Sequence, residues 1–258
     1  MKIFVLVKEV PDTYGDRKLN LETGLADRTA SEAVLDEIGE RALEVALSYA
    51  DAHEGTEVTV LSLAPESAAA TVRKGLAMGA ANAVHVVDDG LVGADIILTA
   101  EALAAAIRRA EFDLVITGNV STDGSGGMLP AALAELLDVP HLTGLNAVEI
   151  GESEAAGVRP VDGGVQRVSA SLPTVVSITE ALPDARFPNF KGIMAAKKKP
   201  LETVSLADLG VRADDPDAAR SIMLSVAERP PREAGIKITD EGNAGEQLAD
   251  FLIENRLV

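Results

Sequence analysis

The stretch with the clearest chemical meaning is Gly118–Met128, which reads Gly-Asn-Val-Ser-Thr-Asp-Gly-Ser-Gly-Gly-Met. It lies between an apolar segment and a helical one, and its glycines and small polar residues let backbone N–H groups approach an anion. The helix that follows adds its positive end, so the stretch suits a phosphate. It lacks the Gly-Lys-Ser/Thr ending of a P-loop, and Leu129 stands where the dinucleotide fingerprint needs a third glycine. The alternative is a flexible turn with a C-cap. Asp123 does not suit a position beside a phosphate, and its alternative role is to cap the next segment or to orient the loop.

Two further segments carry residues that can meet a ligand. After the first apolar segment, Lys8 can meet a charged ligand or pair with Glu9 and Asp12, and Tyr14 can stack on a ring. Asp36 begins a helical segment, where the helix macrodipole favours acidic residues. That position explains Asp36 by itself, but its carboxylate can also accept from a ribose hydroxyl or an adenine amino group.

The segment Asp184–Met194 is rich in aromatic residues and is followed by a basic run that ends at Pro200. One interpretation is a loop that covers the core and carries solvated lysines. The other is a partner-docking loop, because Phe187 and Phe190 are two of only seven aromatic residues and aromatic side chains dominate interface energetics.

Composition limits the remaining possibilities. The chain has 258 residues, a net charge of −18 and no cysteine. Nucleic acid is an unfavourable partner for so acidic a chain, and without cysteine there is no thiol catalysis and no Cys-ligated metal. The three histidines are scattered, and we expect His85 to be a buried core residue. We therefore expect a cytoplasmic protein with no membrane insertion, no metal site and no catalytic residues, in which any redox chemistry must come from a bound organic cofactor.

The segments that position these residues alternate between strand and helix. Period and composition predict strands at 2–7, 57–63, 82–87, 113–117 and 173–179, and helices at 34–50, 66–78, 94–110 and 130–137. This order predicts an α/β fold with a mainly parallel, doubly wound sheet, whose ligands bind beyond the carboxyl ends of the strands. Antiparallel strands are expected at 145–150, 157–161 and 165–172.

The chain is expected to divide near residue 210. Residues 1–210 form the nucleotide-binding domain, with a distinct loop and short helix at 184–200, and residues 211–258 form an extended C-terminal arm. Leu248, Phe251 and Leu252 give the arm a terminal helix. The arm either packs on a partner subunit or folds back on its own domain.

Together these segments resemble the beta (small) subunit of electron-transferring flavoprotein. The resemblance covers almost the whole chain and is most specific at Arg186–Lys199. Its motifs are Lys8-x-Val10-Pro11-Asp12-Thr13, Asp36–Ala42, Arg73–Ala80, Gly118–Gly124, Leu172–Ser177, Arg186–Lys199 and Lys237–Gly242.

The resemblance implies an adenine-nucleotide α-hydrolase-like sheet and a heterodimer with an alpha subunit that holds most of the FAD. It also implies a structural AMP in this chain, with the Gly118–Leu129 loop at the phosphate. The implied cofactor-binding residues are Leu6, Val7, Lys8, Asp36, Ile38, Gly39, Leu63, Gly118, Asn119, Val120, Ser121, Thr122, Asp123, Gly124, Ser125, Gly126, Gly127, Met128 and Leu129.

The resemblance further implies a recognition loop, residues 184–200, that docks acyl-CoA dehydrogenase-type donors, with electrons passing on to a quinone-linked acceptor. Phe190 matches the anchor position, where many relatives have leucine. The implied docking residues are Phe187, Phe190, Lys191, Gly192, Ile193 and Met194, and Thr13 and Tyr14 are expected near the partner's flavin.

Three other functions are considered. A bifurcating relative would hold a second FAD in place of AMP. An ATP-using enzyme of the α-hydrolase type would need a pyrophosphate motif, and no convincing one is present. A stress-type nucleotide-binding module would be shorter and would lack the loop and the arm.

Overall fold

The computed structural model describes residues 1–232 and 234–258. Contacts between residues divide them into two units, Met1–Leu224 and Ser225–Val258. The predicted boundary near residue 210 stays a prediction. Within the first unit, residues 211–224 run over the surface, and Arg220 pairs with Glu101 there. The second unit contains one helix, α7 (Ala244–Glu254).

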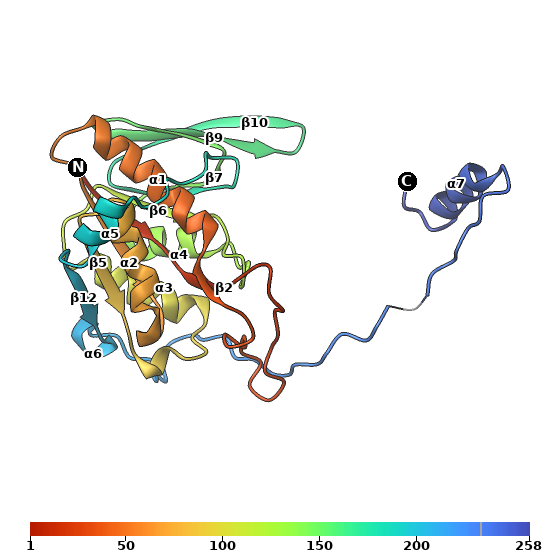
Figure 1. Ribbon diagram of the computed structural model, residues 1–258, viewed down its shortest axis with the longest axis horizontal. Coiled ribbons are helices and arrows are strands. Elements are labelled where there is room, and N and C mark those ends of the chain that lie inside the picture. The colour runs from red at the N-terminus through yellow and green to blue at the C-terminus, as the bar shows by residue number, and fades with distance from the viewer. Residues whose placement is uncertain (233) are drawn as a thin grey trace. The chain divides into compact units, whose positions relative to one another are not determined.

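The first unit is built on a seven-stranded parallel sheet, which confirms the predicted fold class (Figure 1). Its strand order is β12-β5-β4-β1-β6-β11-β7. The strands are β1 (Lys2–Leu6), β4 (Glu57–Leu63), β5 (Asn82–Val86), β6 (Leu114–Gly118), β7 (His141–Leu145), β11 (Thr174–Ile178) and β12 (Leu201–Val204).

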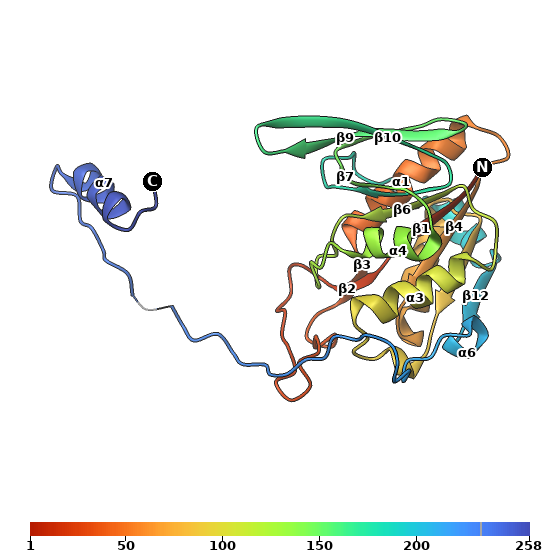
Figure 2. The same cartoon turned by 180° about the vertical axis from the view of Figure 1, so that it is seen from behind.

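Helices cover both faces of this sheet. On one face α5 (Phe190–Ala196) packs on α2 (Ala69–Met78) with Ala196 as its buried residue, and α1 (Glu37–Ala52) and α2 bury their apolar sides against the strands. On the other face, α3 (Ile96–Ile107) and α4 (Leu129–Leu137) do the same, as the rear view in Figure 2 shows. Strand β1 contributes side chains to both cores, because successive side chains of a strand point to opposite faces of the sheet.

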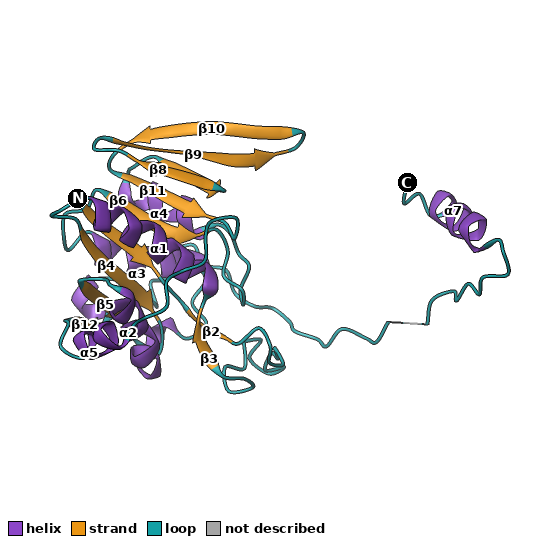
Figure 3. Cartoon of the chain, turned by 45° about the horizontal axis from the view of Figure 1, so that its top comes forward, coloured by secondary structure: helices purple, strands orange, loops and turns teal. Residues whose placement is uncertain are grey.

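Two smaller antiparallel sheets complete the unit. A three-stranded sheet of β8 (Ala147–Ile150), β9 (Glu154–Val161) and β10 (Gly164–Ser171) lies at one end (Figure 3). A two-stranded one pairs β2 (Glu9–Pro11) with β3 (Ala33–Leu35). Short 3-10 turns at Glu66–Ala68 and Asp89–Leu91 and the short helix α6 (Leu206–Leu209) complete the elements of the first unit.

Several predicted boundaries were wrong. The helix predicted at 34–50 begins at Glu37, because the residues before it pair as β3, and the helix predicted at 94–110 ends at Ile107. β7 and β12 were not predicted as parallel strands, because neither has a continuous apolar run. The predicted return of residues 173–179 to the main sheet is confirmed by β11, which lies between β6 and β7. No helix among the described residues is long and apolar enough to cross a membrane.

Candidate functional site

The parallel strands all end on the same side of the sheet, which we call the carboxyl edge, and this edge has a switch point between β1 and β6. From β1 the chain continues to β4 and β5 on one side, and it then returns to place β6 on the other side of β1. The segments that follow β1 and β6 therefore diverge here, and ligands of open α/β sheets bind in the resulting crevice. The predicted residues Leu6, Val7 and Leu63 all lie at this edge, the first two buried and Leu63 half-buried.

Asp36 joins the two diverging segments. Its backbone N–H donates to the Lys8 carbonyl at 2.9 Å, and its Oδ2 accepts from the Thr122 N–H at 2.9 Å. The side chain is only 3% exposed, and this burial raises the pKa of Asp36 against the opposing effect of the Thr122 N–H. Asp36 therefore contacts the glycine-rich loop, a contact that the sequence analysis did not predict.

Three polar atoms in this cluster have no partner among the described residues. They are Asp36 Oδ1, Asn119 Oδ1 and Thr122 Oγ1, and all three are buried. A buried polar atom without a hydrogen bond costs about 1–3 kcal/mol, so such atoms are rare in finished interiors. The cluster thus presents acceptor groups and a hydroxyl that an incoming polar ligand can satisfy.

Asp123 is balanced by basic groups rather than facing a phosphate alone. Its Oδ1 accepts from Lys8 Nζ at 2.7 Å and its Oδ2 from Arg28 at 3.3 Å, while Arg17 donates to the Thr122 carbonyl. Burial opposes ionisation of the carboxyl, but Lys8 outweighs it and lowers the pKa of Asp123. Asp123 therefore orients the loop, as its alternative role required.

The expectation that Lys8 pairs with Glu9 or Asp12 was wrong. The Glu9 carboxylate instead accepts from the Thr71 hydroxyl at 2.5 Å, and the Asp12 carboxylate accepts from the backbone N–H of Tyr14. Lys8 crosses to the loop after β6 because the two strands are neighbours. Sequence separation hides this contact, since Asp123 follows Lys8 by 115 positions.

The last part of the loop offers backbone donors. Ser125 and Gly127 have positive φ values of 49° and 67°, which turn the chain into α4. Within the part of the chain that the structure describes, the N–H groups of Gly126, Gly127 and Met128 donate no hydrogen bond. They precede a nine-residue helix whose N-terminus attracts anions, so together they form a place for a phosphate.

The start of α1 closes over the end of β6. A Cβ on Gly118 would lie 2.2 Å from Ile38 Cγ2, and a Cβ on Gly39 would lie 3.4 Å from Val7 Cα. Only glycine therefore allows this approach at Gly118, which brings the predicted Ile38 and Gly39 to the edge beside the loop.

The remaining loop residues follow the same path from β6 to α4. Val120 and Met128 are exposed, Ser121 accepts from the Ser125 N–H through its carbonyl at 3.0 Å, and Gly124 donates to Ser121 Oγ at 3.2 Å. The loop thus has internal order besides its contacts with Asp36 and Lys8. Leu129 is the first residue of α4.

The recognition loop lies near the opposite side of the sheet, where the parallel strands begin, which we call the amino edge. Its helix α5 packs on α2 near the C-terminal end of that helix, where Gly192 faces the Ala77 carbonyl. Phe187 and Phe190 are 93% and 79% exposed, and Lys191, Ile193 and Met194 are exposed as well. The predicted docking side chains are therefore exposed on the outer side of α5, whereas Gly192 lies on the inner side against α2.

Thr13 and Tyr14 lie in the long excursion between β2 and β3, and Tyr14 is 98% exposed. Their predicted closeness to a flavin stays a prediction. Sequence reasoning missed Arg17 and Arg28 in the same excursion, which hold it against the Gly118–Met128 loop. Nothing in an irregular polar segment marks which arginine returns to a distant loop.

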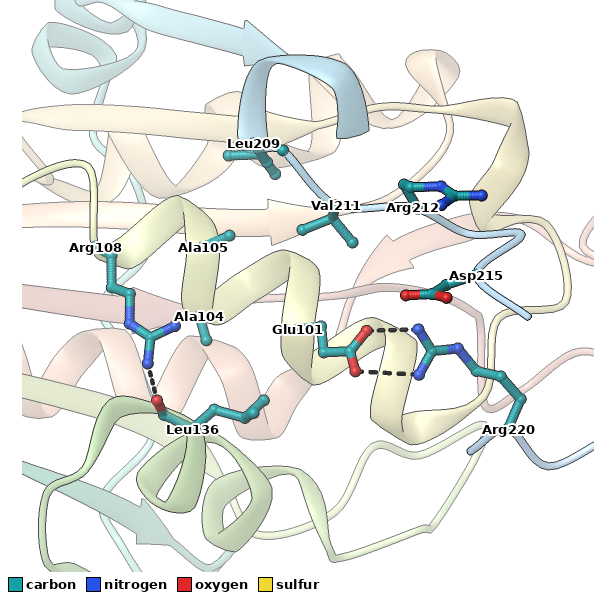
Figure 4. A pocket seen from close by; sticks show the side chains of 11 residues that line it. Glu101, Ala104, Ala105, Arg108, Leu136, Leu209, Val211, Arg212, Asp215 and Arg220 are labelled. Atoms are coloured by element: carbon teal, nitrogen blue, oxygen red, sulfur yellow. Dashed lines mark hydrogen bonds and ion pairs between the residues drawn. The ribbon is translucent and has the colours of Figure 1, made fainter. Parts of the chain in front are cut away.

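A hollow of about 360 Å³ lies elsewhere, over α3 and α6 (Figure 4). There Arg220 makes a two-pronged ion pair with Glu101 at 2.6 and 3.1 Å, which fastens residues 211–224 to α3. Its lining differs from the predicted site residues. It consists of Glu101, Ala104, Ala105, Arg108, Leu136, Leu209, Gly210, Val211, Arg212, Asp215 and Arg220.

Comparison with known proteins identifies the family of the chain. The family model described as the electron transfer flavoprotein domain matches residues 23–209. An electron transfer flavoprotein subunit beta from Mycobacterium bovis is 47% identical, with 99% of both chains covered. One from Bacillus subtilis is 34% identical over 98% of this chain and 96% of its own.

A third relative is named as subunit CarD of the caffeyl-CoA reductase-Etf complex of Acetobacterium woodii. It is 32% identical over 82% of this chain and 80% of its own. Full-length coverage by beta subunits and the family match over most of the chain leave one assignment. The chain belongs to the electron transfer flavoprotein family, as a beta subunit.

Proposed function

We propose that this beta subunit pairs with an electron transfer flavoprotein alpha subunit and binds AMP as a structural nucleotide. In that heterodimer it would carry electrons from acyl-CoA dehydrogenase-type flavoenzymes to a quinone-linked acceptor. The FAD, held mostly by the alpha subunit, supplies the redox chemistry when bound. This chain's residues hold the nucleotide, dock the donor and enclose part of the partner's flavin.

The observation that carries the nucleotide proposal is the set of unpartnered polar groups at the β1–β6 switch point. Asp36 Oδ1 and Asn119 Oδ1 are acceptors that suit the adenine amino group or a ribose hydroxyl. The N–H groups of Gly126–Met128, at the start of α4, suit the phosphate. Lys8 and Arg28 neutralise Asp123, so the buried carboxylate does not repel the anion.

The arm is proposed as part of the heterodimer interface. The α7 helix carries Leu248, Phe251 and Leu252 on one face, the first two exposed and Leu252 half-buried, and such an apolar helix face is typical of a surface that a partner covers. This proposal is independent of the nucleotide proposal, because it concerns different residues.

The direct test is the nucleotide content of the heterodimer, purified with its alpha subunit, denatured, and analysed by chromatography and mass. One FAD and one AMP per heterodimer are expected. Two FAD molecules and no AMP would replace the structural nucleotide by a second, redox-active flavin of the bifurcating kind. If the heterodimer contained neither AMP nor a second FAD, that result would contradict a nucleotide site in this chain.

A matched pair of variants tests the phosphate position. A Cβ at Gly126 would meet only Ile96 Cδ1, at 3.7 Å, and Gly126→Asp and Gly126→Asn add side chains of nearly the same shape, so the two variants differ mainly in charge. The aspartate places a negative charge beside the phosphate, and we expect it to lose most of its AMP while the asparagine variant keeps it. Equal AMP content in the two purified heterodimers would show that the phosphate lies elsewhere.

A further inference from the structure

The recognition loop is held to the body of the domain at its first end by Arg186. Its Nε and one terminal nitrogen donate to the two oxygens of Glu44, both at 2.8 Å, and its backbone N–H donates to Glu44 at 2.9 Å. The other terminal nitrogen donates to Asp51 at 2.8 Å. Both acidic residues belong to α1, so the loop begins on a rigid helix.

Lys199 holds the second end. Its ammonium donates to three carbonyls at the C-terminal end of α2, those of Leu76, Gly79 and Ala80, at 3.1, 3.2 and 2.6 Å. A cation is well placed there because the last carbonyls of a helix lack intrahelical partners. Arg73 of α2 donates in return to the Ala196 carbonyl of α5 at 3.0 Å.

Between these ends α5 is seated on α2. The Asn189 side chain accepts from the Gly192 N–H at 2.8 Å and caps the helix. A Cβ at Gly192 would lie 2.4 Å from the Ala77 carbonyl oxygen, so the backbone sits directly on α2. The side chains of Arg186, Asn189 and Lys199 are hydrogen-bonded. The rings of Phe187 and Phe190 face solvent.

We propose that the recognition loop docks donors as a preformed surface, and that Arg186 and Lys199 are positioning residues that hold Phe190 in its docking orientation. This rests on the docking role proposed above. A surface ordered before the encounter loses little conformational entropy on binding, so a single exposed anchor suffices for a transient partner. The opposite mechanism is a loop that folds only on the donor.

The test uses the complete heterodimer as electron acceptor for a medium-chain acyl-CoA dehydrogenase reduced with octanoyl-CoA. Two variants loosen the loop by different means: Arg186→Lys removes the directional pairs with Glu44 and Asp51, and Gly192→Ala wedges α5 away from Ala77. The matched controls are Arg159→Lys and Gly164→Ala in the β9–β10 hairpin, where a Cβ at Gly164 meets nothing within 4 Å.

We expect both loosening variants to raise the KM for the heterodimer by about fivefold to tenfold, which corresponds to about one pairwise contact. The maximal rate and flavin content stay unchanged, and amide hydrogen exchange at residues 184–200 becomes faster. The control variants should change neither the KM nor the hydrogen exchange at residues 184–200. Faster exchange with an unchanged KM would overturn the positioning role, as would unchanged exchange in both variants.

A third variant separates this proposal from the one on which it rests. Phe190→Ala removes the anchor without touching its supports. If it leaves KM unchanged, the docking role itself is wrong. If it raises KM while Arg186→Lys and Gly192→Ala do not, docking stands and the preformed surface is wrong.

Discussion

The two edges of the parallel sheet are built in opposite ways. At the carboxyl edge, charged and polar groups are buried, and Asp36, Asn119 and Thr122 each have an atom without a partner among the described residues. At the amino edge, the supports Arg186 and Lys199 of the recognition loop are hydrogen-bonded, and its aromatic rings are exposed. In the function proposed above, a retained nucleotide would complete the first edge, whereas the second would be complete before its partner arrives.

This difference matches the two functions proposed for one chain. A structural nucleotide can stabilise the fold, since a ligand at 100 times its Kd adds about 2.7 kcal/mol. A docking surface must release its partner quickly, so it gains from order rather than from tight binding. The beta subunit is an electron-transfer protein rather than an enzyme, and neither edge has to carry bond-breaking groups.

The strongest way to break the comparison is a substitution at the crowded carboxyl edge. In Gly118→Ala the new Cβ meets Ile38 Cγ2 at 2.2 Å, and overpacking of this kind costs about 1–3 kcal/mol. We expect a lower free energy of unfolding by urea together with loss of AMP, because α1 carries Asp36 away from the loop. The control Gly164→Ala should change neither, and a Gly118→Ala protein with full AMP would contradict the tight fit.

A pH titration of stability tests whether buried polar groups on the nucleotide side matter. Burial lowers the pKa of His85, against the opposing effect of the Ala64 carbonyl, so the folded chain resists the proton that the unfolded chain binds near pH 6.5. Stability should therefore fall as pH drops from about 6.5 to 5, by about 1.4 kcal/mol for each unit of pKa difference.

His85→Gln should flatten this slope, whereas His141→Gln, on the exposed start of β7, should not. The measurement is the free energy of unfolding of each variant at a series of pH values. A slope that survives in His85→Gln would assign the pH dependence to other groups.

The smallest effect on stability is expected at the recognition loop. Phe190→Ala should leave the free energy of unfolding within about 0.5 kcal/mol of the original, because the ring is exposed. Thermal melting of the heterodimer measures this stability, and the KM of the same variant, described above, measures docking. A large loss of stability would mean that the ring supports the fold and is not free for docking.

Much of this fold could be predicted from the chain. Apolar runs such as 57–63 and the helical segments predicted at 34–50 and 66–78 identify the central strands and their covering helices. The prediction failed where a strand is defined by its neighbours, as in β12, whose pairing with β5 gives order to a short mixed segment. Strand edges have no local signal of this kind.

The candidate site was predictable to a similar degree. The glycine-rich loop identifies itself by composition and by its place after a strand. The contacts that organise it do not, because Lys8, Arg17 and Arg28 reach Asp123 or Thr122 across at least 95 residues. The basic run before Pro200 was interpreted as solvated or docking, whereas Lys199 caps α2, a role that depends on three-dimensional packing alone.

The most direct measurement compares both edges in one experiment. Amide hydrogen exchange of the heterodimer is followed with its AMP retained and after the nucleotide has been stripped. We predict added protection at residues 36–39 and 118–129 when AMP is present, and the same exchange at residues 184–200 in both states. No change at the carboxyl edge, or an equal change at the recognition loop, would contradict the account.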